Sequence, residues 1–230
     1  MSMFDSILAV IPPLATGALL LLSTVLKKGQ ICPGQRGRIH KILPLILILW
    51  VLASFKLPFV LLNVVFIGFF MTKVQTGKTR EEGPLYALYI ANVFSVLVVI
   101  YQMFMAPTWV AGVLVLIEAF ILGLIGAHWM LTMARTRLQA FHKILPVSGI
   151  FAAMAIALVL VPFASSLDPV TLNELLHVIL INFALLVTAV VIWAWHLIVT
   201  RSISKVQISV ASILMLVSIV SFHQVYFHVI

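Results

Sequence analysis

The chain has 230 residues, of which 63% are hydrophobic and 9% are charged, and its mean hydropathy is +1.24. Soluble domains use about 45–50% apolar and about 25% charged residues, so this composition excludes a soluble globular protein. The formal net charge of +8 would suit nucleic-acid binding, but the basic residues lie in short gaps between apolar runs and form no continuous face. The single cysteine, Cys32, excludes an internal disulfide framework.

Apolar runs of near-membrane length follow one another along the chain, and each is predicted to be a transmembrane helix. In chain order they are Ser6–Leu26, Ile39–Phe55, Leu57–Thr72, Pro84–Phe104, Trp109–Met133, Ile144–Ala164, Val170–Thr200 and Val206–Val229. The first is expected to be retained, because Asp5 precedes it without a basic flank or a clear cleavage site. The predicted fold class is therefore all-α, a polytopic membrane helix bundle of about eight transmembrane helices.

The stretch from Ile42 to Thr72 decides between seven helices and eight. A single helix over this stretch would be roughly 46 Å long at ~1.5 Å per residue, well beyond a hydrocarbon core of ~30 Å. Lys56 would also lie near the middle of that helix. Two short helices that turn at residues 54–58 avoid both problems.

The distribution of basic residues favours eight helices with both termini on the outer side. Lys and Arg accumulate in cytoplasmic loops, and this topology leaves only Lys56 outside, at a turn where its long stem can reach the interface. The inside loops then hold Lys27, Lys28, Arg36, Arg38, Lys41, Lys73, Lys78, Arg80, Arg135, Arg137, Lys143, Arg201 and Lys205. We therefore expect an integral protein of a bacterial inner membrane that contacts lipid and binds no nucleic acid. Oligomers and partner subunits are left open.

A repeated pentapeptide predicts an internal duplication. The residues His40-Lys41-Ile42-Leu43-Pro44 recur as His142-Lys143-Ile144-Leu145-Pro146, each time after a basic loop and before an apolar run. Because both copies open helices that run from inside to outside, the halves 1–104 and 105–230 are predicted to be parallel repeats of four helices. The alternative is that His-Lys is an interfacial flank and that Pro occupies the first turn of a helix.

The basic-flanked histidines of this motif, His40 and His142, resemble the His-Arg helix starts of small bacterial membrane b-type cytochromes. The resemblance covers only these few residues in each half. Pro44 and Pro146 stand where a glycine often follows the histidine in such proteins. The resemblance implies a haem-binding redox protein.

Glu118 is the one carboxylate well inside a predicted span. Placing an ionisable group at such depth costs free energy, so the group usually faces a bundle interior and marks a candidate functional site. We predict a proton or solute site near Glu118 between the two repeats, with Asn182 at a similar depth and His177 as further members. The structural alternative is a protonated glutamate that bonds to a neighbouring helix.

The histidines form two layers. Toward the inside lie His40, His142, His128 and His196, and toward the outside lie His177, His223 and His228. A haem b group needs two imidazoles on facing helices at one depth. The pairs His177 with His223 and His128 with His196 are the candidate haem or metal ligands, while interfacial histidines beside aromatic belts are the alternative.

These features leave three functions open. The first is a small transporter or an ion- or proton-conducting protein, for which the eight short helices favour a proton, a metal ion or a small solute. The second is a membrane haem or quinone-linked redox protein, and the third is a membrane subunit or assembly factor without chemistry of its own. No nucleophile elbow, phosphate loop or dinucleotide fingerprint occurs, so no catalytic residue is predicted and enzymatic activity is left open.

Overall fold

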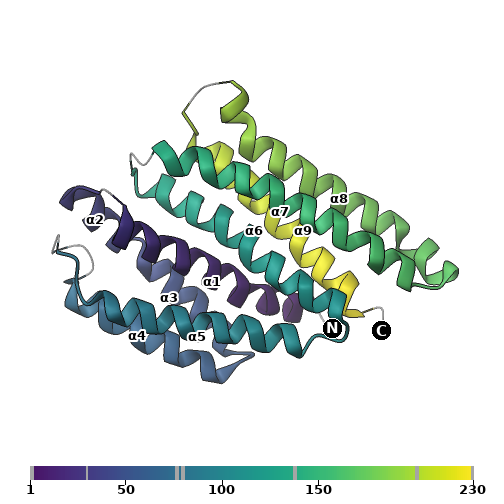
Figure 1. Cartoon of the computed structure of the whole chain (residues 1–230), viewed down its shortest axis with the longest axis horizontal. Helices are drawn as coiled ribbons and strands as arrows, with labels where there is room; N and C mark the ends of the chain where they lie inside the picture. Colours follow the sequence, from purple (N-terminus) through teal and green to yellow (C-terminus); the bar gives the residue numbers. More distant parts are fainter. Residues whose placement is uncertain are drawn as a thin grey trace.

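The structure is a computed structural model that describes residues 3–29, 31–75, 78, 81–136, 139–199 and 202–228. In this described part every regular element is a helix (Figure 1). The elements are α1 (Met3–Lys28), α2 (Pro33–His40), α3 (Leu43–Ser54), the short 3₁₀ helix η1 (Pro58–Val60), α4 (Leu61–Lys73), α5 (Leu85–Phe104), α6 (Trp109–Met133), α7 (Gln139–Ser166), α8 (Pro169–Ile198) and α9 (Lys205–His228). The predicted all-α class is confirmed.

Among the described residues, seven helical stretches are long and apolar enough to cross a membrane, and α2 with α3 counts as one of them. A shorter apolar helix, Pro58–Lys73, joins η1 and α4. The predicted turn at residues 54–58 is confirmed, because α3 ends at Ser54 and η1 begins at Pro58. The bundle therefore contains the eight predicted apolar helices, one of them shorter than the rest.

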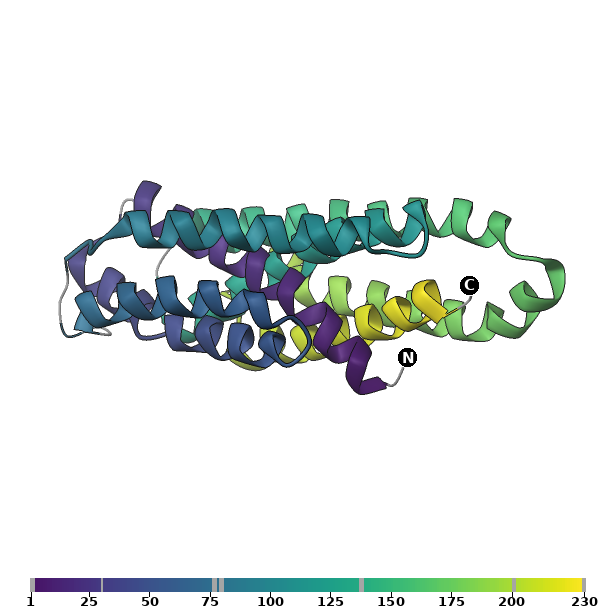
Figure 2. The ribbon, with the colours of Figure 1, turned by 90° about the horizontal axis from the view of Figure 1, so that it is seen from below.

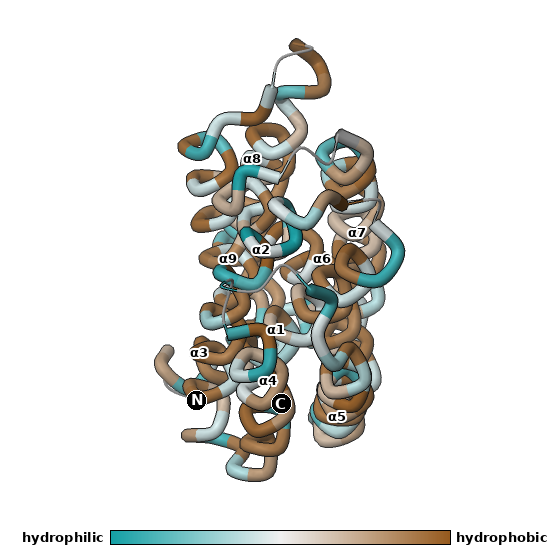
Figure 3. The backbone as a smooth tube through the Cα atoms, turned by 90° about the vertical axis from the view of Figure 1, so that its left-hand side faces the viewer, coloured by the Kyte–Doolittle hydropathy of each residue, from teal (hydrophilic) through white to brown (hydrophobic). Residues whose placement is uncertain are grey.

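Large apolar side chains cover the outside of the bundle. Leu158 on α7 is 72% exposed and Val65 on α4 is 63% exposed, and every long helix carries similar residues. Figure 3 shows hydrophobic backbone along the helices, with hydrophilic residues gathered toward helix ends and connecting loops. A surface of this kind is stable only against lipid, so the chain is an integral membrane protein.

Both termini lie at the same end of the bundle (Figures 1 and 2). The opposite end carries the connections α1–α2, α4–α5, α6–α7 and α8–α9, and we call it the basic end because the predicted inside loops lie there. Of the basic residues assigned to these loops, Arg80, Arg137 and Arg201 lie outside the described residues. The exposed Cys32 also lies at the basic end, between α1 and α2.

Two turns at the end that holds the termini carry charged side chains, Asp168 before α8 and Lys56 after α3. The Asp168 carboxylate caps α8 by accepting the backbone N–H groups of Val170 and Thr171, each at 3.0 Å. The Thr171 hydroxyl also donates to Asp168, and this bond, with the backbone bonds, holds the pKa of Asp168 below its ordinary value. Burial lowers the pKa of Lys56, while the nearby charge of Asp5 opposes that shift.

The helices pack as two rings of four. In the first half α1 contacts α3 and α5, and α4 also contacts both, so that the ring closes. In the second half α6 contacts α7 and α9, and α8 also contacts both. The two rings meet mainly where α1 crosses α6, with further contacts of α5 with α6 and of α1 with α9.

The crossing of α1 and α6 depends on glycine. A Cβ atom on Gly17 would lie 2.1 Å from the carbonyl oxygen of Ala119 and 2.6 Å from the Cα atom of Gly123. Backbone atoms of the two helices therefore touch, as small residues allow in membrane bundles. No side chain larger than hydrogen fits at this position.

The two copies of the repeated pentapeptide have different backbones. The first copy interrupts a span, because α2 ends at His40 and α3 begins at Leu43 with Pro44 in its first turn. The second copy lies inside the continuous α7, which begins at Gln139, earlier than the predicted start at Ile144. A proline beyond the first turn cannot donate to the carbonyl four residues earlier, so Pro146 leaves the carbonyl of His142 without its helical partner.

Candidate functional site

The second ring holds most of the buried carboxyl and imidazole groups that the structure describes. Glu118 and His128 on α6 are fully buried, and His223 on α9 and His196 on α8 are 2% and 6% exposed. Among the described residues of the first half of the chain, the only comparable group is His40, at the end of α2. Charged groups are costly at such positions unless they are partnered, so the contacts of these residues are informative.

Glu118 pairs with His223. The Nδ1 atom of His223 lies 3.1 Å from Oε1 and 3.3 Å from Oε2 of Glu118, so the contact joins α6 to α9. The imidazole also stacks on the ring of Phe227, with 4.1 Å between ring centroids. The other ring nitrogen, Nε2, is buried without a hydrogen-bond partner.

This pair can hold a proton in two ways. A proton between Nδ1 and a carboxylate oxygen belongs either to an imidazolium beside a carboxylate or to a carboxylic acid beside a neutral imidazole. Transfer between the two states moves the proton by less than the 3.1 Å that separates Nδ1 from Oε1, and it needs no movement of the backbone. Carboxylate and histidine chains of this kind carry protons in membrane pumps and transporters.

Asn182 and His177 were predicted to share the site of Glu118, and neither has a recorded contact with it. Asn182 on α8 is buried, but its backbone carbonyl accepts a bond from the hydroxyl of Ser218 at 2.9 Å, and its Nδ2 atom has no partner. Ser218 precedes His223 by five residues on α9, which is ~7 Å along the helix. His177 is exposed on α8. The structure therefore joins Glu118 to His223, a residue named from the sequence as a candidate haem or metal ligand and not as a partner of Glu118.

A second cluster lies closer to the basic end and contains His128, His142, His196 and Trp193. The indole Nε1–H of Trp193 donates to Nδ1 of His128 at 2.8 Å. Because an indole nitrogen only donates, His128 carries its proton on Nε2 and donates to Nδ1 of His142, also at 2.8 Å. The Nε2–H of His142 then donates to the carbonyl of Thr136 at 3.3 Å. These bonds form one chain from α8 to the connection that follows α6.

His196 is fixed by a carbonyl that Pro146 has freed. Its Nε2 atom lies 2.9 Å from the carbonyl oxygen of His142, and its Nδ1 atom lies 2.9 Å from the carbonyl oxygen of Trp193. Carbonyl oxygens only accept, so the ring donates to both only when both nitrogens carry protons. The cluster thus contains a position where an additional proton gains a hydrogen bond.

Trp193 occupies its position because α7 carries glycine opposite it. A Cβ atom on Gly149 would lie 2.1 Å from Cζ3 of the indole. From the sequence, Trp193 is expected only in an interfacial aromatic belt and His142 only in the inner histidine layer and the repeated motif. The spacing of Pro146 after His142 is the signal that could have indicated a side-chain partner for the freed carbonyl.

His40, the counterpart of His142 in the first copy of the motif, does not belong to this cluster. Its ring is fully buried, both of its nitrogens lack hydrogen-bond partners, and it contacts the edge of Phe70 with 5.5 Å between ring centroids. The two identical motifs therefore give one connected histidine and one isolated histidine.

The two histidine pairs named as candidate haem ligands have different surroundings in the structure. Both ring nitrogens of His128 and both of His196 already face partners within the protein. In the other predicted pair, His177 is exposed while His223 is buried against Glu118. Within the described residues, no three His, Cys, Asp or Glu side chains are grouped closely enough to hold a metal ion.

Comparison with known protein families identifies a match over nearly the whole chain. The sequence model of a family described as an integral membrane domain matches residues 3–223. No curated protein and no solved structure matches the chain.

Proposed function

We propose that the chain, which belongs to the integral membrane domain family, conducts protons through its second ring of helices. The protons move alone or coupled to a small ion or solute. The observation that carries this proposal is the buried pair of Glu118 and His223, with 3.1 Å between Oε1 and Nδ1. A carboxyl and an imidazole without any Lys or Arg among their recorded partners are suited to exchanging a proton rather than to holding a permanent charge.

The proposed route has an outer and an inner part. Glu118 and His223 form the outer part, and the bonded imidazoles of His128 and His142 form the inner part. The indole of Trp193, which only donates, and the carbonyl of Thr136 hold these two rings in place. Glu118 and His128 are ten residues apart on α6, or ~15 Å. The buried Ser218 and Asn182 are joined at 2.9 Å and lie inward of His223, which supports a polar route between the two parts.

We also propose that residues 1–104 and 105–230 are parallel repeats. The identical ring contacts of the two halves support this proposal. So does the Gly17–Ala119 contact, since these residues are separated by the same interval as His40 and His142. By that interval Glu118 corresponds to Thr16, whose hydroxyl donates to the carbonyl of Ser95 on α5 at 3.2 Å. In each half, this position of the first helix bonds to the last helix.

The proposed orientation places the basic end in the cytoplasm of a bacterium, with both termini outside its inner membrane. The exposed native Cys32 tests this orientation without a new cysteine. In intact cells we expect a membrane-impermeant maleimide to leave Cys32 unlabelled until the membrane is permeabilised. A Cys32→Ser/Pro107→Cys variant, with its cysteine in the exposed α5–α6 turn, should label directly. Labelling of Cys32 in intact cells would reverse the proposed orientation.

Proton flux into proteoliposomes tests the function itself. With a potassium diffusion potential and a pH-sensitive dye inside the vesicles, the wild-type protein should acidify the lumen. Glu118→Gln keeps the shape of the side chain but removes its titration, so we expect flux to fall by about 100-fold. Glu174→Gln removes an exposed carboxyl of the same half and should conduct like the wild type. Unchanged flux in Glu118→Gln would disprove the proposed route.

A further inference from the structure

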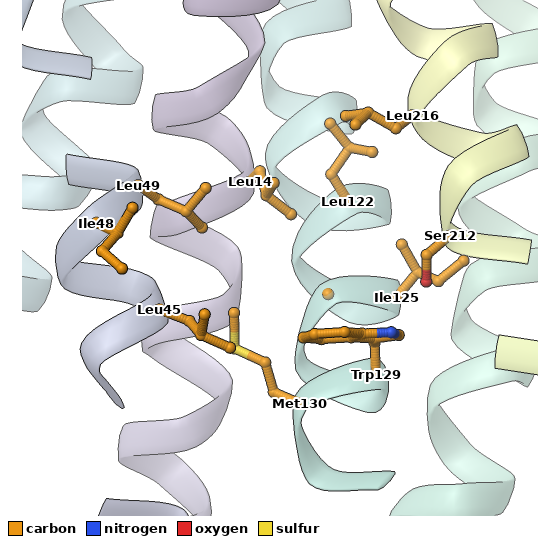
Figure 4. Close-up of a pocket in the computed structure, with 11 residues that line it drawn as sticks. Leu14, Leu45, Ile48, Leu49, Leu122, Ile125, Trp129, Met130, Ser212 and Leu216 are labelled. Atoms are coloured by element: carbon orange, nitrogen blue, oxygen red, sulfur yellow. The ribbon is translucent and has the colours of Figure 1, made fainter. Parts of the chain in front are cut away.

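An apolar cavity lies between the two rings, away from the histidines. It has a volume of about 250 Å³ and is bounded by α1 and α3 on one side and by α6 and α9 on the other (Figure 4). Its lining residues include Leu14, Leu49, Leu122, Trp129 and Ser212. Ser212 is the only lining residue with a hydroxyl group, and that group already donates to the carbonyl of Ile208 on its own helix at 2.7 Å.

The cavity opens sideways into the surrounding lipid. Leu45 and Ile48 line it from α3, and they are 37% and 51% exposed on the outer surface of the bundle. A polar solute would find little here besides the oxygen of Ser212, which can accept a hydrogen bond. An unfilled space beside the lining residues would forfeit their van der Waals contacts, so a lipid chain that can reach the cavity gains by filling it.

Trp129 and two lysines mark the end of the cavity that faces the interface. The indole of Trp129 forms part of the wall, and its N–H donates to the hydroxyl of Ser209 at 2.9 Å, an arrangement typical of the boundary between lipid tails and headgroups. Lys41 lies between α2 and α3, one turn before Leu45, and Lys205 begins α9, two turns before Ser212. Both lysines are exposed. Positive charge therefore flanks the apolar wall on both sides.

We propose that this cavity binds one acyl chain of an anionic phospholipid whose phosphate is held between Lys41 and Lys205. The apolar lining selects the hydrocarbon tail, and the two ammonium groups select the negative headgroup. The lipid would lie across the seam of the two rings and fill the space that α3 and α9 leave between them.

Lipid retention by the purified protein tests this proposal. Native mass spectrometry in detergent should detect one tightly retained phosphatidylglycerol and much weaker retention of phosphatidylcholine with the same acyl chains. Lys41→Gln/Lys205→Gln should reduce phosphatidylglycerol retention by about tenfold. Lys143→Gln, at the counterpart of Lys41 within α7, should leave it unchanged. Equal retention of both lipids by the wild type, or no loss in the double variant, would overturn the proposal.

A second measurement needs no change in the lysines. Phosphatidylglycerol with brominated acyl chains should quench Trp129 as well as the exposed Trp109 and Trp195. The quenched component of the fluorescence should therefore be smaller in Trp129→Phe than in the wild type. Ser212→Phe narrows the cavity and should weaken quenching without removing the lysines. If Trp129→Phe loses no quenched component, no acyl chain occupies the cavity and the proposal is wrong.

Discussion

Replacement of His223 by leucine is expected to lower the free energy of unfolding by about 3–5 kcal/mol, because it leaves the buried Glu118 without its partner. Both groups of the pair are almost fully removed from the surface, so nothing screens or solvates the remaining carboxyl. Reversible unfolding in mixed detergent micelles, followed by circular dichroism, measures the change. This substitution has the largest expected effect on the polar interior.

The double variant Glu118→Leu/His223→Leu separates an unpaired charge from lost packing. Replacing both members of a buried pair by apolar residues is often neutral or stabilising by about 1–4 kcal/mol, so the double variant should recover the stability lost in His223→Leu. His177→Leu changes an exposed histidine and should alter stability by no more than ~0.5 kcal/mol. A double variant less stable than His223→Leu would mean that the pair stabilises the bundle by itself.

Gly17→Ala is expected to destabilise the junction of the two rings by about 3 kcal/mol or more. The new methyl group would lie 2.1 Å from a backbone oxygen of α6, and backbone cannot move aside as a flexible side chain does. Because α1 and α6 form the main contact between the rings, separation of these helices affects the whole molecule. Thermal unfolding in detergent and the monodisperse fraction after size-exclusion chromatography measure the effect.

Gly68→Ala is the matched control for this crossing. Gly68 lies on α4, and a Cβ atom there would meet only a side-chain carbon of Leu47 at 3.8 Å. Alanine removes the conformational freedom of glycine in a helix, so this variant should be unchanged or more stable by up to ~1 kcal/mol. Equal stability of Gly17→Ala and Gly68→Ala would show that α1 and α6 separate easily.

The transmembrane helices and the turn near Lys56 were predictable because bilayer thickness sets the length of each apolar run. The partner of Glu118 could not be predicted in this way. Counting residues from a helix end gives the depth of a side chain but neither its rotation about the helix nor the tilt of its neighbours. By depth Asn182 seemed the better match, whereas the packing of α9 on α6 turns His223 toward the carboxyl group.

The contacts of the inner histidine cluster could not be predicted from the sequence for a different reason. His128 and His196 were recognised as a pair at one depth, yet the atoms that connect them belong to Trp193 and to the backbone of His142. A backbone acceptor leaves no mark in residue composition. Only the rule that proline withholds an amide from the carbonyl four residues earlier could have pointed to it.

Among the described residues, that rule leads to a bond between helices at two prolines, and it has a consequence for assembly. Pro13 in α1 withholds its amide from Ala9, whose carbonyl accepts from Nε2 of Gln102 on α5 at 3.0 Å, as the carbonyl of His142 accepts from His196. In lipid, a donor on a neighbouring helix stabilises a carbonyl that has lost its helical partner. Each such proline therefore fixes the height at which a neighbouring helix docks during insertion. Apolar packing alone lets helices slide along one another, and these two bonds fix their relative height. The donors, Gln102 and His196, lie on α5 and α8, which neighbour the helices that contain the prolines.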